Sequence, residues 1–395
     1  MTMPRRSVRW LSALLLAVGC GMASPRATNA QTDRVDATGQ RVRIATFNIE
    51  DLRLTDLRRA DHPRLDAIVR TIIELDADAV LINEIEHDGT DRATELLARR
   101  VADAGGPEYT WFTAPSNTGQ PSGLDLNNDG QAVTAFPEPP MADAAGAVPR
   151  QTAEGRAYGN DTWGFGTFPG QYAMALLVRE PLEIQRDNAR TFRLLPWSAM
   201  PDAARPIDPE TGEPWHPDTV WAAMRLSSKS HWDVPVTLPG GKTVHLLCSH
   251  PTPPAFDGPE GRNQRRNHDE IRFWSDYLRD AAWIRDDRGV TGGLDDGTPF
   301  VILGDLNLDP ERPSGYGNAM RDLLAHPRMA PDPRPISANE RGDLPPEVTA
   351  GWGRRVDYAL PSVGLTVLDS GILDPDKPVP SDHFPVWLDV LGAPQ

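Results

Sequence analysis

The stretch Phe300-Val301-Ile302-Leu303-Gly304-Asp305-Leu306-Asn307 joins a short apolar run to polar side chains. The apolar run predicts a buried strand, and the Gly, Asp and Asn that follow end it in a loop. Other apolar runs meet polar residues in the same way: Phe47-Asn48-Ile49-Glu50-Asp51, Ile82-Asn83-Glu84, Cys248-Ser249-His250, and Ser381-Asp382-His383 just before the last strand. Caps and turns explain one polar strand end well, but five together poorly. Because ligands of α/β enzymes collect at strand ends, we expect one shared site.

Strand-like and helix-like segments alternate from residue 41 onward. Apolar residues at helical spacing predict a helix that opens at His62-Pro63, and two more over 91–104 and around 263–285. The remaining strands are expected at 42–47, 78–82, 109–113, 172–178, 243–249, 356–360, 365–368 and 385–390. This pattern predicts an α/β protein.

One domain is expected over residues 41–392, because no linker separates two cores. Gly- and Pro-rich insertions interrupt it at about 114–170 and 195–235, and both are far longer than ordinary loops. We expect these insertions to wall the site. Tryptophans in the second insertion are expected to pack within it.

Composition places the chain among globular proteins and weighs against one class of partner. Of its 395 residues, 39% are apolar and 24% charged, which suffices for a sizeable core. The formal charge is −16, from 40 basic and 56 acidic residues. Nucleic acid is therefore a disfavoured partner, since phosphate backbones are held by clustered Lys and Arg. A local basic groove would escape this argument.

The N-terminus has the pattern of a processing signal. Basic residues precede the apolar run 10–18, which is too short to cross a bilayer, and small residues near Ala30 suit cleavage. We expect a signal peptide over 1–30, a short tail over 31–40, and a secreted or periplasmic protein without a transmembrane segment. A lipoprotein anchored at Cys20 is the less favoured alternative. Cys248 then stands alone, in a run that predicts a buried core position.

The polar strand ends resemble the endonuclease/exonuclease/phosphatase superfamily of exonuclease III-like and DNase I-like hydrolases. The similarity runs in order along most of the chain, through Thr46-Phe47-Asn48-Ile49, Asn83-Glu84, Ser249-His250-Pro251, Gly304-Asp305-Leu306-Asn307, Arg355-Val356-Asp357-Tyr358 and Ser381-Asp382-His383-Phe384-Pro385-Val386. The resemblance implies a four-layer α/β/β/α sandwich of two mixed sheets flanked by helices. It places the site where the polar edges of the two sheets meet.

The same resemblance implies roles for single residues. Glu84 is similar to the family's principal ligand of Mg²⁺ or Mn²⁺, and the other implied ligands are Asn48, Glu50 and Asp382. Glu50 and Asp51 compete for one of these positions. The implied catalytic residues are Asp305 and Asn307, which position water, His383, which contacts phosphate, Asp357, which orients that ring, and His250, beside the phosphate or leaving oxygen.

Two departures from the family pattern stand out. Asn83 occupies the place where the family usually has Gln. The family's usual Tyr near the phosphate aligns with Gln171, one residue before Tyr172, and one step along a strand reverses the face. Tyr172 is therefore not assigned to the catalytic set.

Arg262 and Arg266 lie at i, i+4 spacing after the His250 loop. One hypothesis is that they bind an anionic part of the substrate, because arginine matches phosphate with two hydrogen bonds. The alternative is pairing with nearby acids: Asp257, Glu260, Asp269 and Glu270.

A second cation site is suggested by Asp125, Asn127 and Asp129, which fit the opening of an EF-hand loop. Phe136 stands where the closing Glu belongs. Ca²⁺ that orders the insertion and a loop of Asx-turns without an ion are both consistent with this segment.

The expected function is a secreted, divalent-metal-dependent phosphoesterase that cleaves a P–O bond by direct attack of water, on a small or head-group substrate. A secreted nuclease is the first alternative. A calcium-ordered binding module with an inactive site is the second.

Overall fold

The computed structural model describes residues 40–312, 315–375 and 379–392. The predicted signal peptide, Cys20 and nearly all of the predicted tail lie outside these residues. No helix within the described ranges is long and apolar enough to cross a membrane.

The first sheet is mixed and is built around the N-terminal strand. Its order is β11 (Val367–Ile372), β12 (Val386–Leu391), β1 (Arg41–Leu52), β2 (Ala79–Ile85), β4 (Ala173–Val178) and β3 (Thr110–Phe112). The pair β1–β2 is parallel and the other pairs are antiparallel.

The second sheet is mixed in the same way. Its order is β10 (Asp357–Pro361), β9 (Phe300–Asp305), β8 (Thr243–Ser249), β7 (His231–Thr237) and β5 (Glu183–Ile184), with β6 (Arg190–Thr191) also paired to β7. Only β8 and β9 run parallel in it.

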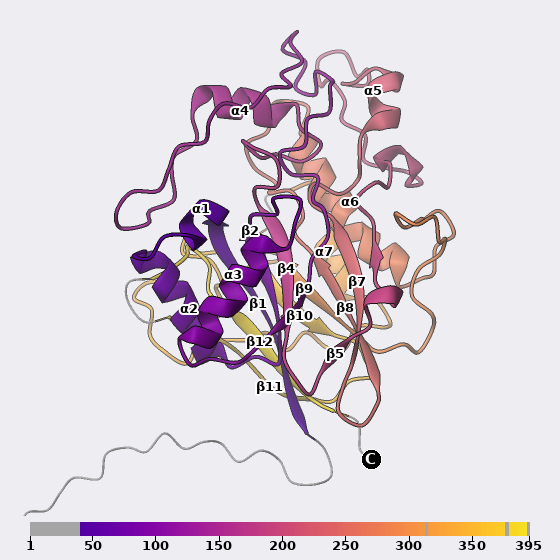
Figure 1. Cartoon of the computed structure of the whole chain (residues 1–395). Helices are drawn as coiled ribbons and strands as arrows, with labels where there is room; N and C mark the ends of the chain where they lie inside the picture. The colour runs from indigo at the N-terminus through magenta and orange to yellow at the C-terminus, as the bar shows by residue number, and fades with distance from the viewer. Residues whose placement is uncertain (1–39, 313–314, 376–378, 393–395) are drawn as a thin grey trace, which may run out of the picture. The chain divides into compact units, whose positions relative to one another are not determined.

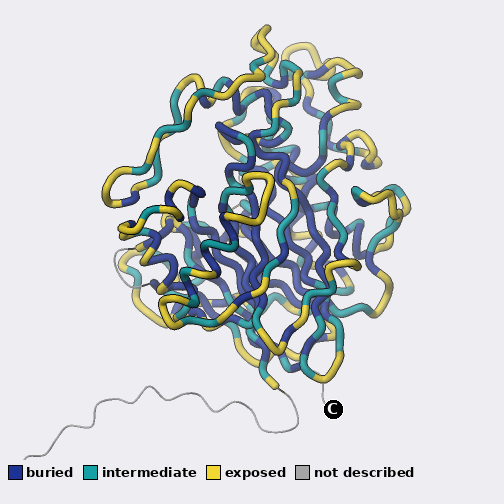
Figure 2. The backbone as a smooth tube through the Cα atoms, in the orientation of Figure 1, coloured by how far each residue is buried: buried dark blue, intermediate teal, exposed yellow. Residues whose placement is uncertain are grey.

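Helices cover the outer face of each sheet (Figure 1). α2 (Pro63–Leu75) and α3 (Arg92–Asp103) pack on the first sheet, and α6 (Arg262–Tyr277) and α7 (Ala319–Leu324) pack on the second. Short helices lie in the connections: α1 (Leu54–Leu57), α4 (Ala153–Asn160), η1 (Arg186–Asn188), η2 (Trp197–Ala199) and α5 (Asp218–Ala223). The backbone of the sheets is the most deeply buried part (Figure 2). The predicted four-layer α/β/β/α sandwich is confirmed.

Strand alternation decides which side chains meet between the sheets. In β1, Val42 and Ile44 face the second sheet, while Ala45 and Phe47 face the helices. The next inward positions are Thr46 and Asn48. The same two-residue spacing brings the polar residue beyond each apolar run to the inner face: Asn48, Asn83, His250, Asp305 and Asp357.

Several element bounds differ from the expectation. Residues 231–235 begin β7, although the prediction placed them in the second insertion. The strand was missed because Asp233 and Pro235 interrupt its alternation of apolar residues. The short helices inside the insertions (α4, η2 and α5) and the short strands β5 and β6 between the insertions were also missed. The helix expected to reach residue 285 ends at Tyr277, and turns follow it, with Asp280 in the left-handed region at φ 53°. Cys248 is fully buried, as predicted.

Candidate active site

A cavity of about 540 Å³ opens where the polar ends of the two sheets meet. Its floor is polar and includes Glu50, Glu84, Asp305, Asn307, Asp382 and His383. Its walls come from residues 253–256, after β8, and from Trp352, Arg354 and Val356, before β10. The described residues of this lining come from neither long insertion, although Lys229, which lies in the predicted second insertion, is buried beside the floor. The expectation that the insertions wall the site stays a prediction.

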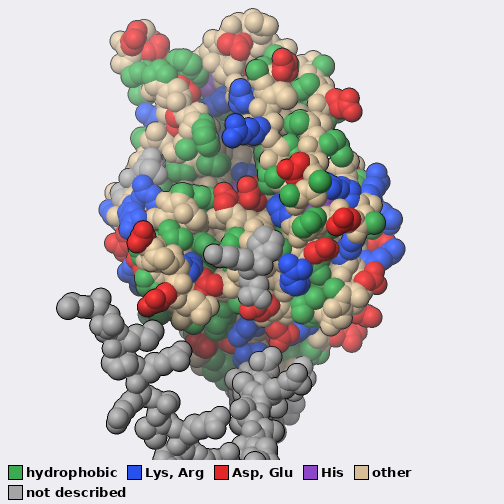
Figure 3. Space-filling model, turned by 90° about the vertical axis from the view of Figure 1, so that its left-hand side faces the viewer, with side chains coloured by type: hydrophobic (Ala, Val, Ile, Leu, Met, Phe, Trp, Pro, Cys, Tyr) green, Lys and Arg blue, Asp and Glu red, His purple; other side chains and the backbone are tan. Residues whose placement is uncertain are grey.

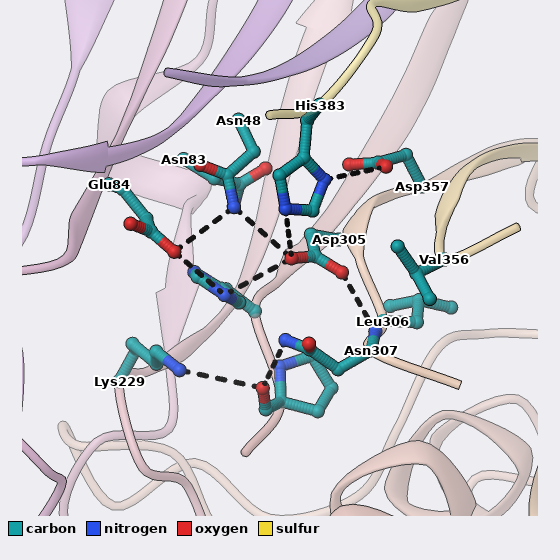
Figure 4. Close-up of polar contacts among 12 residues, drawn as sticks. Asn48, Asn83, Glu84, Lys229, Asp305, Leu306, Asn307, Val356, Asp357 and His383 are labelled. Carbon is teal, nitrogen blue, oxygen red and sulfur yellow. Dashed lines mark hydrogen bonds and ion pairs between the residues drawn. The ribbon is translucent and has the colours of Figure 1, made fainter. Parts of the chain in front are cut away.

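Asn48 links the two sheets at the floor (Figure 4). Its side-chain nitrogen donates to Glu84 Oε1 and to Asp305 Oδ2, both at 3.1 Å. Beside it, Thr46 Oγ1 donates to Asn83 Oδ1 at 3.1 Å. Asn48 therefore holds the carboxylates of β2 and β9 close together, although 257 residues separate it from Asp305.

Several residues at this floor adopt a left-handed backbone that non-glycine residues rarely take. The φ angles are 53° at Glu50, 52° at Asp51, 68° at Glu84 and 57° at Asn307. The register of β1 against β2 shifts between Asn48 and Leu52, and that of β2 against β4 shifts across Glu84. Strict alternation would turn Glu84 toward the helices, whereas the bulge brings it to the inner face. Such conformations cost about 1–3 kcal/mol each and cluster at functional sites.

The competition between Glu50 and Asp51 is resolved by their contacts. Asp51 is buried, and its Oδ2 forms an ion pair with Arg53 at 2.5 Å and accepts from Gln171 Nε2 at 2.9 Å. Glu50 lines the cavity, and its Oε2 accepts the backbone N–H of Asp382 at 3.3 Å. Burial, reinforced by the charge of Asp382, raises the pKa of Glu50 to about 7. Glu50 is the residue placed to serve the site.

His383 and Asp357 form a buried pair. His383 Nδ1 lies 2.8 Å from Asp357 Oδ2, while Nε2 lies 3.7 Å from Asp305 Oδ2. Burial opposes a charge on this ring, but the carboxylates of Asp357 and Asp305 outweigh it and raise the pKa of His383 to about 10. The ring is therefore an imidazolium at neutral pH, with Nδ1–H donated to Asp357 and Nε2–H free to meet an anion.

Asp305 and His250 complete the floor. Asp305 Oδ1 accepts the backbone N–H of Asn307 at 2.9 Å, and His250 Nε2 lies 3.5 Å from Asp305 Oδ2. Burial raises the pKa of Asp305 to about 7, against the opposing charge of His383. Burial also lowers the pKa of His250 well below its ordinary value, and the charges of Lys229 and His383 add to that effect. A neutral His250 thus lies beside a carboxylate of raised basicity.

Lys229 belongs to this site and was missed from the sequence. Its side chain is buried and donates to the Pro251 carbonyl at 3.4 Å, the same oxygen that accepts from Asn307 Nδ2 at 3.1 Å (Figure 4). Burial lowers its pKa, and the carboxylates of Glu270, Glu84 and Asp305 oppose that change. The only available signal was the rarity of lysine, which occurs three times in the whole chain.

Comparison with known proteins assigns this arrangement. The model of the Endonuclease/Exonuclease/phosphatase family matches residues 45–383. The chain belongs to this family. Members of the endonuclease/exonuclease/phosphatase family are hydrolytic phosphoesterases that generally depend on divalent metal. A search of curated proteins found no significant match.

Solved structures with a similar fold are distant in sequence. The endonuclease/exonuclease/phosphatase protein of Beutenbergia cavernae DSM 12333 is 17% identical, with 89% of this chain and 72% of that chain covered and a TM-score of 0.48. The human Nocturnin catalytic domain with bound sulfate is 15% identical, with 93% and 99% covered and a TM-score of 0.44. A mannosyl-6-phosphatase of Bacteroides thetaiotaomicron VPI-5482 is 13% identical, with 88% and 99% covered and a TM-score of 0.44.

The donor set of this family member suits a hard divalent cation. Single ligand atoms of Asp305, Asp357 and His383 lie within 4.8 Å of one another. A protonated His383 has no lone pair to offer, so the carboxylates are the better ligands. Burial raises the pKa of Glu84, Glu50 and Asp382. Raised pKa values are expected where several carboxylates lie close together without a cation to balance their charge. Among the predicted ligands, the carboxylates of Glu50, Glu84 and Asp382 therefore suit Mg²⁺ or Mn²⁺. Asn48 directs its side-chain nitrogen at Glu84, and its Oδ1 accepts the Glu50 N–H at 3.0 Å, so its role as a ligand stays a prediction.

Arg262 and Arg266 lie away from the floor of this cavity. Arg266 is buried and donates to the carbonyls of Leu226, Trp163 and Arg225, and Arg262 donates to the Leu126 carbonyl. These contacts are neither the acid pairs of the alternative nor an open anion site. Both side chains border a second, small cavity of about 50 Å³, together with Lys229. Their role in substrate binding stays a prediction.

The loop proposed for calcium is held by its own backbone. Asp125 accepts the N–H groups of Asp129 and Gly130 at 3.2 and 2.8 Å, and Asn127 accepts that of Asp129 at 3.3 Å. These are the hydrogen bonds of Asx-turns. The Ca²⁺ site stays a prediction.

Two residues outside the predicted set lie beside the floor. Gln171, at the family's usual Tyr position, supports Asp51, while Tyr172 has a left-handed backbone at φ 59° and its hydroxyl accepts from Gln151. Burial raises the pKa of Tyr172, and the charges of Asp51 and Glu84 add to this. Tyr172 is therefore a neutral phenol near the acidic cluster.

Proposed function

We propose that the protein is a secreted, divalent-metal-dependent phosphoesterase that hydrolyses a small or head-group phosphate ester by direct attack of water. One observation carries the proposal. A single cavity brings Glu84 and Asp305 beside the His383–Asp357 pair, so that a cation-binding edge and an imidazolium face the same space. Both groups can stabilise the negative charge of a phosphate undergoing hydrolysis.

Each residue has a distinct part in this reaction. Mg²⁺ or Mn²⁺ bound by Glu84 with Asn48, Glu50 and Asp382 would neutralise charge on the phosphate. Asp305 accepts the proton of the attacking water, since its pKa of about 7 makes it a stronger base than an ordinary carboxylate. His383 donates Nε2–H to a phosphate oxygen, and Asp357 keeps the ring oriented and charged.

The cavity volume supports a small substrate. About 540 Å³ lies within the range of sites for small molecules, and loops close to the floor form its walls. The net charge of −16 opposes a long polyanion. A nuclease is the second candidate, because charge also gathers locally. On the face drawn in Figure 3, basic and acidic side chains border opposite sides of a central hollow.

Hydrolysis of bis-p-nitrophenyl phosphate and p-nitrophenyl phosphate tests the proposal. Turnover should require Mg²⁺ or Mn²⁺, stop with EDTA and fall at least a hundredfold in Glu84→Ala. Glu86→Ala is the matched control, because its carboxylate caps the Leu54 N–H at 2.8 Å and does not line the cavity. Loss of activity in both variants, or turnover that survives EDTA, would contradict the assignment.

The ratio of diester to monoester turnover then separates a phosphodiesterase from a phosphatase. Cleavage of plasmid DNA at a higher kcat/KM than either would favour the nuclease. If Glu84→Ala leaves every measured property unchanged, the inactive binding module is the better description.

Secretion rests on the N-terminal sequence pattern. Mass spectrometry of the protein from its native host should give an N-terminus at Gln31. A lipid-modified N-terminus at Cys20 would replace this with membrane anchorage.

A further inference from the structure

One side of the cavity is built from exposed rings. Phe256 is 94% exposed and Trp352 is 52% exposed, and both line the cavity beside Pro253 and Pro254. Folding normally buries rings of this size, because their apolar area dominates core and interface energetics. Two uncovered rings at one cavity are therefore more informative than single exposed apolar residues elsewhere.

The backbone holds Phe256 in its exposed position. Its φ is 59°, a left-handed conformation that is an outlier for a bulky residue. The loop is anchored on both sides: Asn263 Nδ2 donates to the Ala255 carbonyl at 2.7 Å, and Asp257 accepts backbone N–H groups at the start of α6. The hydrogen bonds on both sides of Phe256 therefore hold its backbone in this strained conformation. Strained residues of this kind cluster at ligand sites.

Trp352 is held against the phosphate-contacting histidine. Its ring lies edge-on to His383, with centroids 4.9 Å apart and planes at 83°. The adjacent Gly351 N–H donates to the Asp382 carbonyl at 2.8 Å, which ties this turn to the loop that carries His383. The indole therefore lies beside the position that a group esterified to a phosphate at His383 would occupy.

These surfaces match one kind of chemical group. Indole, phenyl and proline rings present flat apolar faces, on which another flat ring stacks well. A membrane surface is less well matched, because the acids Glu50 and Asp382 border the same opening and would repel anionic lipid.

We propose that the substrate is a phosphate ester whose organic part carries a flat aromatic ring, which packs against Trp352 and Phe256. This inference rests on the proposed function, since it takes the cavity floor as the phosphate site. The ring comes from a nucleobase or from a phenol, and both have the same stacking chemistry. Trp352 and Phe256 are then specificity determinants.

Calorimetry with paired phosphate monoesters in Mg²⁺, with Asp305→Asn in every protein used so that the proposed base is absent, tests this without turnover. One pair is thymidine 5′-phosphate and deoxyribose 5-phosphate, and the other is phenyl phosphate and methyl phosphate. Within each pair the anion is the same and only the ring differs. We expect the ring to tighten Kd about tenfold in the pair that matches the natural substrate, which is in the range of one base–aromatic stack.

The variants Trp352→Ala and Phe256→Ala should reduce that ratio of Kd values to threefold or less. Phe136→Ala is the control, an exposed ring outside the cavity lining whose loss should leave the ratio unchanged. Unequal effects on the two pairs identify the source of the ring.

Three results would overturn the inference. Equal Kd values within both pairs would exclude ring recognition, as would a ratio that survives both substitutions. Loss of binding to phosphatidylcholine vesicles in Phe256→Ala, with no ring preference, would assign the rings to a membrane. If the ring preference holds but no ester is hydrolysed, the proposed function fails and the binding site stands.

Discussion

Replacing Asp357 by Asn should move the alkaline limit of activity by several pH units. The Asn carbonyl can still accept the Nδ1–H of His383 across the present 2.8 Å, so the ring keeps its place and loses only the neighbouring charge. Two unit charges about 4 Å apart interact by about 4 kcal/mol at an effective dielectric constant of 20. That energy corresponds to about three pKa units.

The pKa of His383, about 10 in the native protein, should therefore fall to roughly 7 in Asp357→Asn. Since the imidazolium is the active form, activity in the native protein persists until the pH approaches 10. In the variant, kcat at pH 8.5 should fall roughly thirtyfold, and at pH 7 only about twofold. The assay is the pH dependence of kcat for diester hydrolysis at saturating Mg²⁺, from pH 5.5 to 10.

A second, half-buried histidine–aspartate pair supplies the control. His245 Nδ1 lies 2.6 Å from Asp233 Oδ1, five residues before His250 on the same chain segment. Asp233→Asn should lower the melting temperature and leave the alkaline limit in place. If folded Asp357→Asn keeps the native alkaline limit, the electrostatic account of His383 is refuted.

Three further predictions follow from the contacts of single residues. Lys229→Met should lower kcat/KM at least tenfold, because the lysine neighbours the carboxylates of Glu84 and Asp305. The melting temperature should change little, because the lysine makes one long hydrogen bond. Unchanged kinetics would show that Lys229 does not belong to the site. Glu50→Gln should weaken activation by Mg²⁺ without changing stability, because Glu50 lines the cavity. Asp51→Asn should lower the unfolding free energy by about 3–5 kcal/mol, because it leaves buried Arg53 unpaired. Equal effects of the two variants on stability in urea titration would contradict these separate roles. Burial lowers the pKa of His231 to about 4, so below pH 6.5 the unfolded chain binds a proton that the native ring does not bind. The unfolding free energy should therefore drop by roughly 3 kcal/mol as the pH falls from about 6.5 to 4. A His231→Gln variant whose unfolding free energy falls with pH in the same way would contradict this.

Local sequence pattern accounts for much of the fold and for the identity of the site. Alternation in β1, β8 and β9 is a property of neighbouring residues, and it places Asn48, His250 and Asp305 on the inner faces without knowledge of distant contacts. This alternation was least clear in β7, where Asp233 and Pro235 interrupt the apolar pattern and pairing with strands on both sides stabilises the strand.

The sequence pattern by itself therefore determined most of the elements, the strand ends and the kinds of side chain that gather there, and the resemblance to the family implied the layers. Only the tertiary structure distinguished the contacts of Glu50 from those of Asp51, brought Lys229 to the floor, and placed Phe256 and Trp352 in the cavity lining. The physical reason is that hydrophobic periodicity depends on residues that are close together in the sequence. Bulges with positive φ, buried ion pairs and the loops that face a cavity depend on contacts between segments hundreds of residues apart.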